Sequence, residues 1–177
     1  MIKSIDIDLS KDTPKDRAIR AIQLLLQKYH FRITEQDFEL PWGGSIAILK
    51  DQTPLFIHQF FPEHEMLLLP QKDTLYPKFL LIAPGARISW QYHNRRKEYW
   101  KILFGPVGVI TSATNDQGPT EPKEAGSLLE IGLRARHRLV GLENWAIVAE
   151  IWKHTDPTRP SDESDIVRLE DDFGRSQ

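Results

Sequence analysis

The chain has 177 residues, a formal net charge of −2 and no cysteine, and 40% of its residues are hydrophobic. Length and composition suit one globular domain with a single core, and the lack of cysteine excludes a disulfide scaffold, a thiolate zinc site and a cysteine nucleophile. The nearly balanced charge gives no reason to expect nucleic acid or an anionic membrane as a partner.

The N-terminal segment "MIKSIDIDLSKD" lacks the basic start and the long apolar run of a signal peptide. No window approaches eighteen uninterrupted apolar residues, so we expect no membrane-spanning segment and a cytoplasmic protein. Thr13 and Pro14 then form a helix-start signal. Apolar residues follow at helical spacing, namely Ile19, Ile22, Leu25, Leu26 and Tyr29. The pattern predicts one long helix, about Pro14 to Tyr29, packed against the outside of a sheet.

From Pro41 onward, short β-rich runs alternate with glycine and proline. The runs are "SIAILK", "PLFIHQFF", "MLLLP", "PKFLLIAPG", "ARISWQYH", "EYWKILFG", "VGVITSAT", "GSLLEIG", "HRLVG" and "WAIVAEIWKH". Many short strands with turn signals between them predict an all-β sandwich or barrel. The segment 113–126 is expected to be an exposed polar loop. We expect an N-terminal helical extension (1–40), a barrel (41–155) and a tail (156–177) laid over the body rather than forming a core strand.

The segment "SWQYHNRRKEYW" (89–100) places three polar side chains at informative spacing. Gln91 and His93 are two residues apart, so on a strand they share a face. Glu98 begins the next run, where an antiparallel partner strand could bring it beside His93, and a later strand offers His137. Imidazole, amide oxygen and carboxylate together suit a divalent ion such as zinc, with iron, nickel or manganese as alternatives. On spacing alone, these residues could equally be the polar edge of an ordinary strand.

Several longer motifs resemble one known family. They are "PGARISWQYHNRRKEYWKILFGPVGVI", "GSLLEIGLRARHRL" and the tail "DIVRLEDDFGR", preceded by "PWGG" at 41–44. Together they are similar to the cupin domain of type II mannose-6-phosphate isomerases, which also forms the C-terminal part of bifunctional mannose-1-phosphate guanylyltransferases. The resemblance covers roughly Pro41 to Arg175. It implies a small antiparallel β-barrel (a cupin, or double-stranded β-helix) and a sugar-phosphate isomerase.

The same resemblance implies one divalent metal ion held by Gln91, His93, Glu98 and His137. The sequence departs from the family at two places. The family has three consecutive histidines where this chain has His93-Asn94-Arg95, and a Pro-x-Gly turn where it has Gly132-Leu133-Arg134. The helical extension and the segment 60–77 are additional to the family pattern. The chain lacks the nucleotidyltransferase domain and any glycine-rich phosphate loop, so sugar-nucleotide synthesis is not expected.

An aldose–ketose isomerase needs a metal ion to polarise the carbonyl, a base, and cations for the phosphate. Arg87 lies four residues before Gln91, and period-2 counting places it on the same strand face, where it would be a catalytic or phosphate-binding residue. Lys78 and Arg175 are further candidates for phosphate binding. For Arg87 and Lys78, an ordinary solvated arginine or lysine at the barrel rim is the alternative. No residue stands out as the general base.

Two other functions stay open. The chain could be a cupin enzyme of another type, such as a dioxygenase or epimerase, or a non-catalytic sugar-binding cupin. A glutamine ligand favours the isomerase over a dioxygenase, and the pair Arg87 and Arg175 favours a phosphorylated sugar. The altered turn before His137 supports the binding protein. A homodimer would agree with the resemblance, because small cupins often pair, although no residue indicates one.

Overall fold

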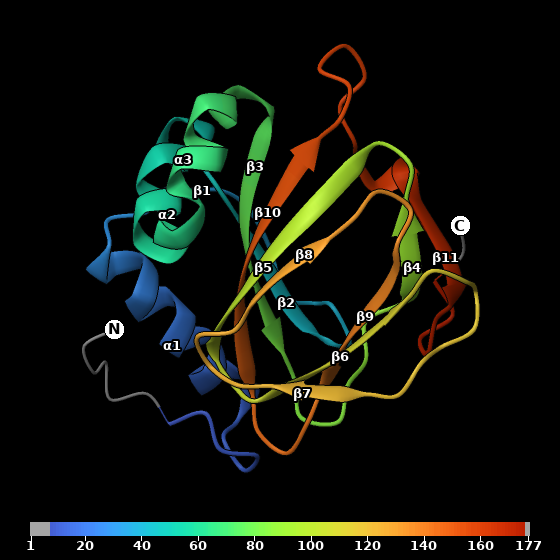
Figure 1. Cartoon of the computed structure of the whole chain (residues 1–177). Helices are drawn as coiled ribbons and strands as arrows, with labels where there is room; N and C mark the ends of the chain where they lie inside the picture. The colour runs from blue at the N-terminus through green and yellow to red at the C-terminus, as the bar shows by residue number, and fades with distance from the viewer. Residues whose placement is uncertain (1–7, 176–177) are drawn as a thin grey trace.

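The computed structural model describes residues 8–175, so residues 1–7 of the expected extension and 176–177 of the expected tail lie outside the described residues. Two antiparallel sheets face one another (Figure 1). The six-stranded sheet has the order β1 (Ile33–Asp37), β2 (Gly43–Ile48), β3 (Leu75–Ile82), β10 (Ala146–His154), β5 (Arg96–Phe104), β8 (Leu128–Ile131). The five-stranded sheet has the order β11 (Ile166–Glu170), β4 (Trp90–His93), β9 (Arg136–Gly141), β6 (Val107–Ser112), β7 (Glu121–Lys123). The predicted fold class, an antiparallel cupin barrel, is confirmed.

The four central strands of the six-stranded sheet, β2, β3, β10 and β5, are largely buried, and their side chains alternate between two cores. On β3, Phe79 and Leu81 point outward to the helices, whereas Leu80 and Ile82 point into the space between the sheets. This division follows from the period of two along a strand. The inward positions of β5 and β10 therefore line the barrel interior, and there the apolar pattern is interrupted by charged residues.

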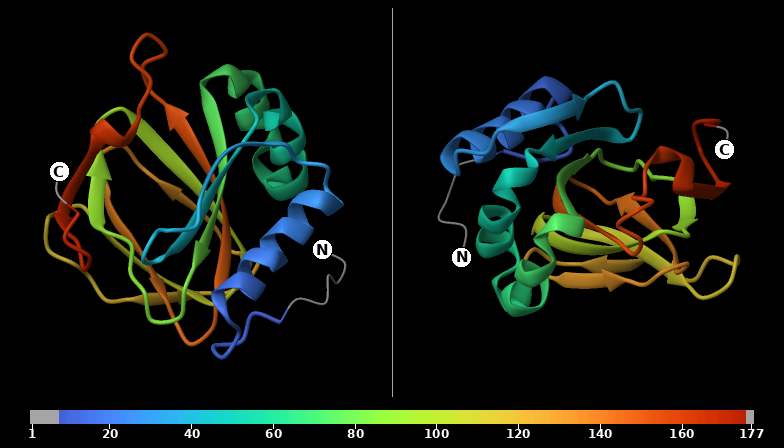
Figure 2. Two further views of the ribbon diagram at one scale, coloured as in Figure 1. Left: turned by 180° about the vertical axis from the view of Figure 1, so that it is seen from behind. Right: turned by 90° about the horizontal axis from the view of Figure 1, so that it is seen from above.

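The helices cover the outer face of this sheet (Figure 2). The predicted long helix is α1 (Lys15–Lys28), and its buried Ile22, Leu25 and Leu26 pack into the outer core. Pro14 is itself the N-cap residue, and the Thr13 hydroxyl contacts Ser10 instead of capping the helix. Among residues 8–175, no helix combines the length and the apolar character needed to cross a membrane.

Two expected strands are helical. The runs "PLFIHQFF" and "MLLLP" form α2 (Thr53–Phe60) and α3 (Glu65–Leu68). Short 3-10 turns flank them, η1 (Lys50–Gln52), η2 (Pro62–His64) and η3 (Leu69–Thr74), and a last one, η4 (Glu163–Asp165), lies in the tail. The prediction failed because an apolar run of eight residues has no periodicity that separates strand from helix. Burial of Phe56, Ile57 and Phe60 against the sheet selects the helix.

Three strands were not expected. Strand β1 lies in the predicted helical extension and pairs with β2, and β7 lies within the predicted loop 113–126 and pairs with β6. The tail does more than cover the body, because β11 pairs with β4 and forms one edge of the five-stranded sheet. Since β4 is one of the strands expected to carry metal ligands, the tail directly supports that part of the barrel.

The helical layer should depend on Phe79, whose fully buried ring contacts those of Phe31, Phe56 and Phe60. We expect Phe79→Ala to lower the free energy of unfolding by about 3–5 kcal/mol, because it opens a cavity between the sheet and the helices. Urea denaturation followed by circular dichroism measures the change. The exposed Leu55 provides a matched control, and a Phe79→Ala loss as small as that of Leu55→Ala would contradict this packing account.

Candidate metal centre

The four predicted metal ligands converge at the inner end of the barrel. Gln91 and His93 project from β4, and His137 on the neighbouring β9 lies directly opposite Gln91 in the register. Glu98 reaches them from β5, which belongs to the other sheet. Glu98 thus comes beside His93 across the space between the sheets, and not through pairing of β4 with β5 as the sequence suggested. His93, Glu98 and His137 form a buried cluster that could hold a metal ion.

The distances within this cluster fit a single ion. Nε2 of His93 lies 3.2 Å from Nε2 of His137 and 3.1 Å from Oε1 of Glu98, and Nε2 of His137 lies 3.4 Å from Oε2 of Glu98. Two nitrogen ligands at about 2.0–2.1 Å from a tetrahedral zinc ion are separated by roughly 3.3 Å. The three donor atoms therefore have the spacing of three ligands around one centre.

Hydrogen bonds fix which ring atoms carry lone pairs. Nδ1 of His137 donates to the carbonyl oxygen of Ala135 (2.9 Å), so its Nε2 is unprotonated. Nε2 of His93 lies 3.1 Å from Nη2 of Arg96, and because a guanidinium can only donate, this Nε2 is also an acceptor. Two lone pairs then face each other, which a cation between them would stabilise. Burial, opposed by the charge of Glu98, lowers the pKa of His137 to about 4, so the ring is neutral at pH 7.

Arg96 supplies the positive charge nearest to Glu98. Its Nε donates to Oε1 of Glu98 (2.8 Å), and its guanidinium stacks on Trp152 with 3.5 Å to the ring centroid. Burial alone would raise the pKa of Glu98, but its neighbours His93, Arg96 and His137 hold this pKa well below its usual value. Glu98 is therefore a carboxylate at neutral pH, as a metal ligand must be.

Gln91 can supply a fourth ligand atom. Its Oε1 accepts a hydrogen bond from the Ser89 hydroxyl, and its Nε2 lies 3.4 Å from Nε2 of His93. Rotation of the amide by 180° turns the oxygen toward the histidines and lets the amide nitrogen donate to Ser89 instead, because a hydroxyl can donate or accept. The donor set of two imidazoles, one carboxylate and one amide oxygen suits a divalent ion of intermediate softness.

The altered turn before His137 keeps a conformation that glycine normally adopts. Arg134 has φ 60°, in the left-handed region, which costs roughly 1–2 kcal/mol for a residue with a side chain. Its backbone N–H donates to the carbonyl oxygen of His93 (3.0 Å), and its Nε donates to Oδ1 of Asn94 (3.2 Å). The departure from the family pattern therefore leaves His137 in the cluster, with the turn tied to the end of β4.

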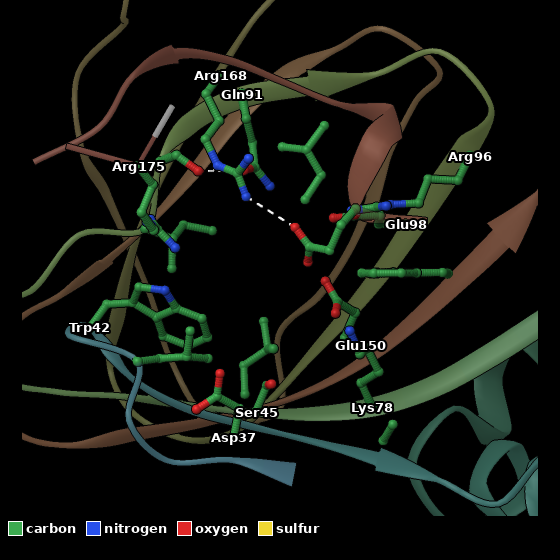
Figure 3. A pocket seen from close by; sticks show the side chains of 18 of the residues that line it. Asp37, Trp42, Ser45, Lys78, Gln91, Arg96, Glu98, Glu150, Arg168 and Arg175 are labelled. Carbon is green, nitrogen blue, oxygen red and sulfur yellow. Dashed lines mark hydrogen bonds and ion pairs between the residues drawn. The ribbon is translucent and has the colours of Figure 1, made fainter. Parts of the chain in front are cut away.

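A cavity of about 340 Å³ reaches this site through Gln91 and Glu98, which line its wall (Figure 3). Its polar wall contains Glu35, Asp37, Ser45, Lys78, Ser89, Gln91, Arg96, Glu98, Glu150, Glu163, Arg168 and Arg175. Its aromatic wall contains Trp42, Trp100 and Trp152. The indole N–H groups of Trp42 and Trp152 are buried and have no hydrogen-bond partner within the described residues. A buried donor without a partner needs an explanation, and a ligand or water oxygen that accepts from it would be one.

Only two of the three residues predicted to bind phosphate lie at the cavity. Lys78 and Arg175 line the cavity, but Arg87 does not. Arg87 donates through Nε and Nη2 to the carboxylate of Asp172 (2.6 and 2.7 Å). The predicted placement of Arg87 on the strand face of Gln91 is wrong, because residues 86–89 precede β4 and period-2 counting does not apply there. Arg87 forms only an isolated bridge with Val140.

Sequence reasoning missed two charged residues of the interior, Arg96 and Glu150. Arg96 stood among three consecutive cations, where only its inward position distinguishes it. Glu150 is the single carboxylate in the apolar run of β10. A charged residue in a strand that is covered on both faces is rare unless it is paired or functional. The charged position in an otherwise apolar run was therefore the sequence signal that could have identified Glu150.

The C-terminal tail holds the turn between β4 and β5 through hydrogen bonds to Asp165. The buried carboxylate of Asp165 accepts hydrogen bonds from the backbone N–H groups of Asn94 and Arg95 (3.2 and 3.0 Å) and from the Ser161 hydroxyl (2.7 Å). Ser161 in turn accepts from Nη1 of Arg96 (3.0 Å). The turn, the tail and the cation beside Glu98 are therefore one connected network.

The sequence matches no family model and no curated protein. Solved structures with a similar fold include an oxalate oxidase in complex with glycolate (17% identity, TM-score 0.45, 54% of this chain and 46% of that chain). Others are KdgF from Halomonas sp. (16%, 0.42, 52% and 75%) and a Cupin 2 conserved barrel domain protein from Salinispora arenicola (18%, 0.40, 46% and 65%). The alignments thus span about half of this chain, and less than two thirds of the oxalate oxidase and of the Salinispora protein. The fold assignment itself rests on the strand order and register described above.

Replacing a ligand should weaken metal binding without unfolding the barrel. We expect His137→Ala to reduce affinity for zinc by at least about 10-fold, because the ion would lose one of its imidazole ligands. Calorimetric titration with zinc after chelator treatment measures this. His58→Ala, which removes an exposed histidine, is the matched control. Equal affinities of the two variants would show that His137 is only a packed strand residue.

Asp165→Asn should loosen the turn in a pH-dependent way. Hydrogen bonds from Ser161 and Arg95 outweigh burial and hold the pKa of Asp165 below its ordinary value. A carboxylate with a lowered pKa stabilises the fold above its unfolded-state pKa, and this stabilisation is lost as the pH falls through the folded value. We therefore expect a loss of about 1–3 kcal/mol at pH 7 and a smaller loss near pH 3. Urea denaturation at both pH values tests this, with the exposed Asp73→Asn as control; a pH-independent loss would contradict it.

Proposed function

We propose that this protein is a metal-dependent aldose–ketose isomerase that interconverts mannose 6-phosphate and fructose 6-phosphate. The observation that carries the proposal is the cluster of His93, Glu98 and His137, of which Glu98 lines a cavity that also presents cations and tryptophan side chains. The motif resemblance described for "SWQYHNRRKEYW" and for the tail supports the same reaction.

The metal centre would be formed by Gln91, His93, Glu98 and His137, with zinc as the first choice of ion. A bound divalent ion supplies Lewis acidity, which polarises a carbonyl group and favours loss of a proton from the adjacent carbon. Arg96 keeps the carboxylate of Glu98 ionised, and Ala135 fixes the ring of His137. These contacts would prepare the ligand atoms before the ion binds.

The outer part of the cavity has the features of a sugar-binding site. Its volume of about 340 Å³ lies at the lower end of the range for small-molecule pockets, which suits one monosaccharide unit. The buried N–H groups of Trp42 and Trp152 would donate to ligand oxygens, and Ser45 would add a hydroxyl. The flat faces of the indole rings would pack against the apolar C–H surface of a sugar.

Lys78 and Arg175 would bind the phosphate. Nε of Arg175 is held by Asp171 (2.9 Å), which fixes the guanidinium at the cavity wall, and Lys78 lies over the ring of Trp152 at 3.8 Å from its centroid. Among the residues that line the cavity, carboxylates nevertheless outnumber lysines and arginines by five to four. A divalent ion would reverse that balance. Binding of a phosphorylated sugar should therefore require the metal as well as the basic residues.

A coupled assay of fructose 6-phosphate formation tests the proposal. Protein supplied with zinc or manganese should turn over mannose 6-phosphate, and chelator treatment should abolish both turnover and the calorimetric binding of the sugar phosphate. Arg175→Met should raise KM by about 10-fold or more, since one charge-assisted contact is lost. Arg159→Met, a change at an exposed arginine outside the cavity, should leave KM unaltered.

Two results would contradict the proposal. Metal-loaded protein that binds hexose phosphates but turns over none of them would be a sugar-binding cupin. Equal turnover before and after complete removal of the metal would exclude the metal-dependent mechanism.

A further inference from the structure

Glu150 occupies the barrel wall next to the metal cluster. In the pairing of β10 with β5, Glu150 lies opposite Trp100 and Trp152 lies opposite Glu98. Glu150 and Glu98 are therefore diagonal neighbours on the same inward face, a relation that keeps side chains within reach of a shared ligand. Figure 3 shows both carboxylates pointing into the cavity.

The contacts of Glu150 leave one of its oxygens for the cavity. Oε1 accepts a hydrogen bond from the indole Nε1 of Trp100 (3.0 Å), which fixes the side chain. Its other oxygen accepts no hydrogen bond from residues 8–175. The same part of the chain forms no ion pair with the carboxylate, although Lys78 is its register partner on β3. A buried carboxylate held at one oxygen, with the other facing a ligand cavity, has the geometry of a general base.

Two carboxylates in the same interior have opposite environments. Glu98 contacts Arg96 and the two histidines, whereas the charged groups that face Glu150 are Lys78, Arg96 and Glu98 itself. Burial, and then the repulsion by Glu98, raises the pKa of Glu150 to about 7. At that value the group can both accept and return a proton near neutral pH.

Building on the proposed isomerase function, we propose that Glu150 is the catalytic residue that carries the proton between C2 and C1 of the sugar. Glu150 takes the proton from C2 of the aldose, and the electrons of the broken C–H bond form the C1–C2 double bond of an enediolate with negative charge on O1. The hydroxyl proton on O2 then passes to O1. The carbonyl forms at C2 as the double-bond electrons take the proton back from Glu150 at C1. The ketose has the same atoms and charge as the aldose, Glu150 is again a carboxylate, and no co-reactant is required.

Other cavity residues are less suited to this step. Glu98 is committed to the cluster, where its oxygens lie within 3.4 Å of both histidines. Lys78 is the remaining basic candidate, because burial lowers its pKa. Its ammonium group, however, lies over the indole ring of Trp152, which favours the charged form and a binding role.

The test compares Glu150→Gln with wild type in three measurements. Glu150→Gln should lower kcat by about 10²–10⁴-fold, because the amide cannot accept the proton. Affinity for mannitol 6-phosphate, a reduced substrate that cannot react, should change by less than about threefold, and zinc content should stay the same. In D2O, wild type should place deuterium at C1 of part of the fructose 6-phosphate, to the extent that the proton on Glu150 exchanges with solvent before it is returned. Glu150→Gln should not exchange the C2 proton of mannose 6-phosphate.

Matched variants separate this role from a structural one. Glu130→Gln removes a carboxylate outside the cavity and should keep wild-type kcat. Glu150→Asp should recover part of the turnover lost in Glu150→Gln, since it restores a base on a shorter side chain. Lys78→Met should raise KM more than it lowers kcat.

The outcomes distinguish a failure of the role proposed for Glu150 from a failure of the proposed isomerase function. Active wild type together with a Glu150→Gln variant within 10-fold of its kcat would overturn the role of Glu150 and leave the isomerase in place. Loss of kcat in Lys78→Met with retention in Glu150→Gln would assign the proton to the lysine. Absence of turnover by metal-loaded wild type would overturn the isomerase and the role of Glu150 together.

Discussion

The buried carboxylate of Glu98 is the constraint around which the inner end of the barrel is arranged. An ionised group without partners in such a place would cost several kcal/mol or more, so the surroundings must supply positive charge or donors. Arg96 does so from the same strand, and the histidines of β4 and β9 complete the shell. Breaking a buried pair of this kind typically costs about 3–5 kcal/mol, so the two sheets are held together partly by the same contacts that would hold a metal ion.

Arg96 extends that constraint to the C-terminal tail. Its guanidinium reaches Ser161, Ser161 reaches Asp165, and Asp165 closes on the turn between β4 and β5. Strand β11 then adds hydrogen bonds along β4. The tail is therefore part of the structural support of the ligand strand. The position of the cavity wall and the position of the candidate ligands cannot be altered independently, because both depend on this network.

The sequence predicted an element or a site residue correctly where the local periodicity of apolar and polar residues determines the structure. Gln91 and His93 could be placed because a strand presents every second side chain on one face, and α1 because its apolar stripe is long enough to define a helical period. The run 53–60 has no such pattern, and burial against the sheet decided its conformation. Arg87 was misplaced because β4 begins only at Trp90, a boundary that no local signal marks. Glu150 was missed because its neighbours are brought by β3 and β5, which are distant in sequence.

Glu98 and Glu150 are neighbouring carboxyl groups on one barrel wall, and their surroundings suit them to different chemical roles. Both residues lie on inward positions of adjacent strands, and both are almost completely buried. The cation and imidazoles around Glu98 hold its pKa low. Burial, and then the charge of Glu98, raises the pKa of Glu150 to about 7, although the indole of Trp100 donates to it. Neighbouring carboxyl groups whose pKa values are pushed apart commonly divide the roles of ligand and proton carrier in enzymes. Glu98 belongs to the cluster and also raises the pKa of Glu150, so a change in the charge at Glu98 would change the pKa of Glu150 as well. A single electrostatic interaction therefore links the two halves of the proposed site.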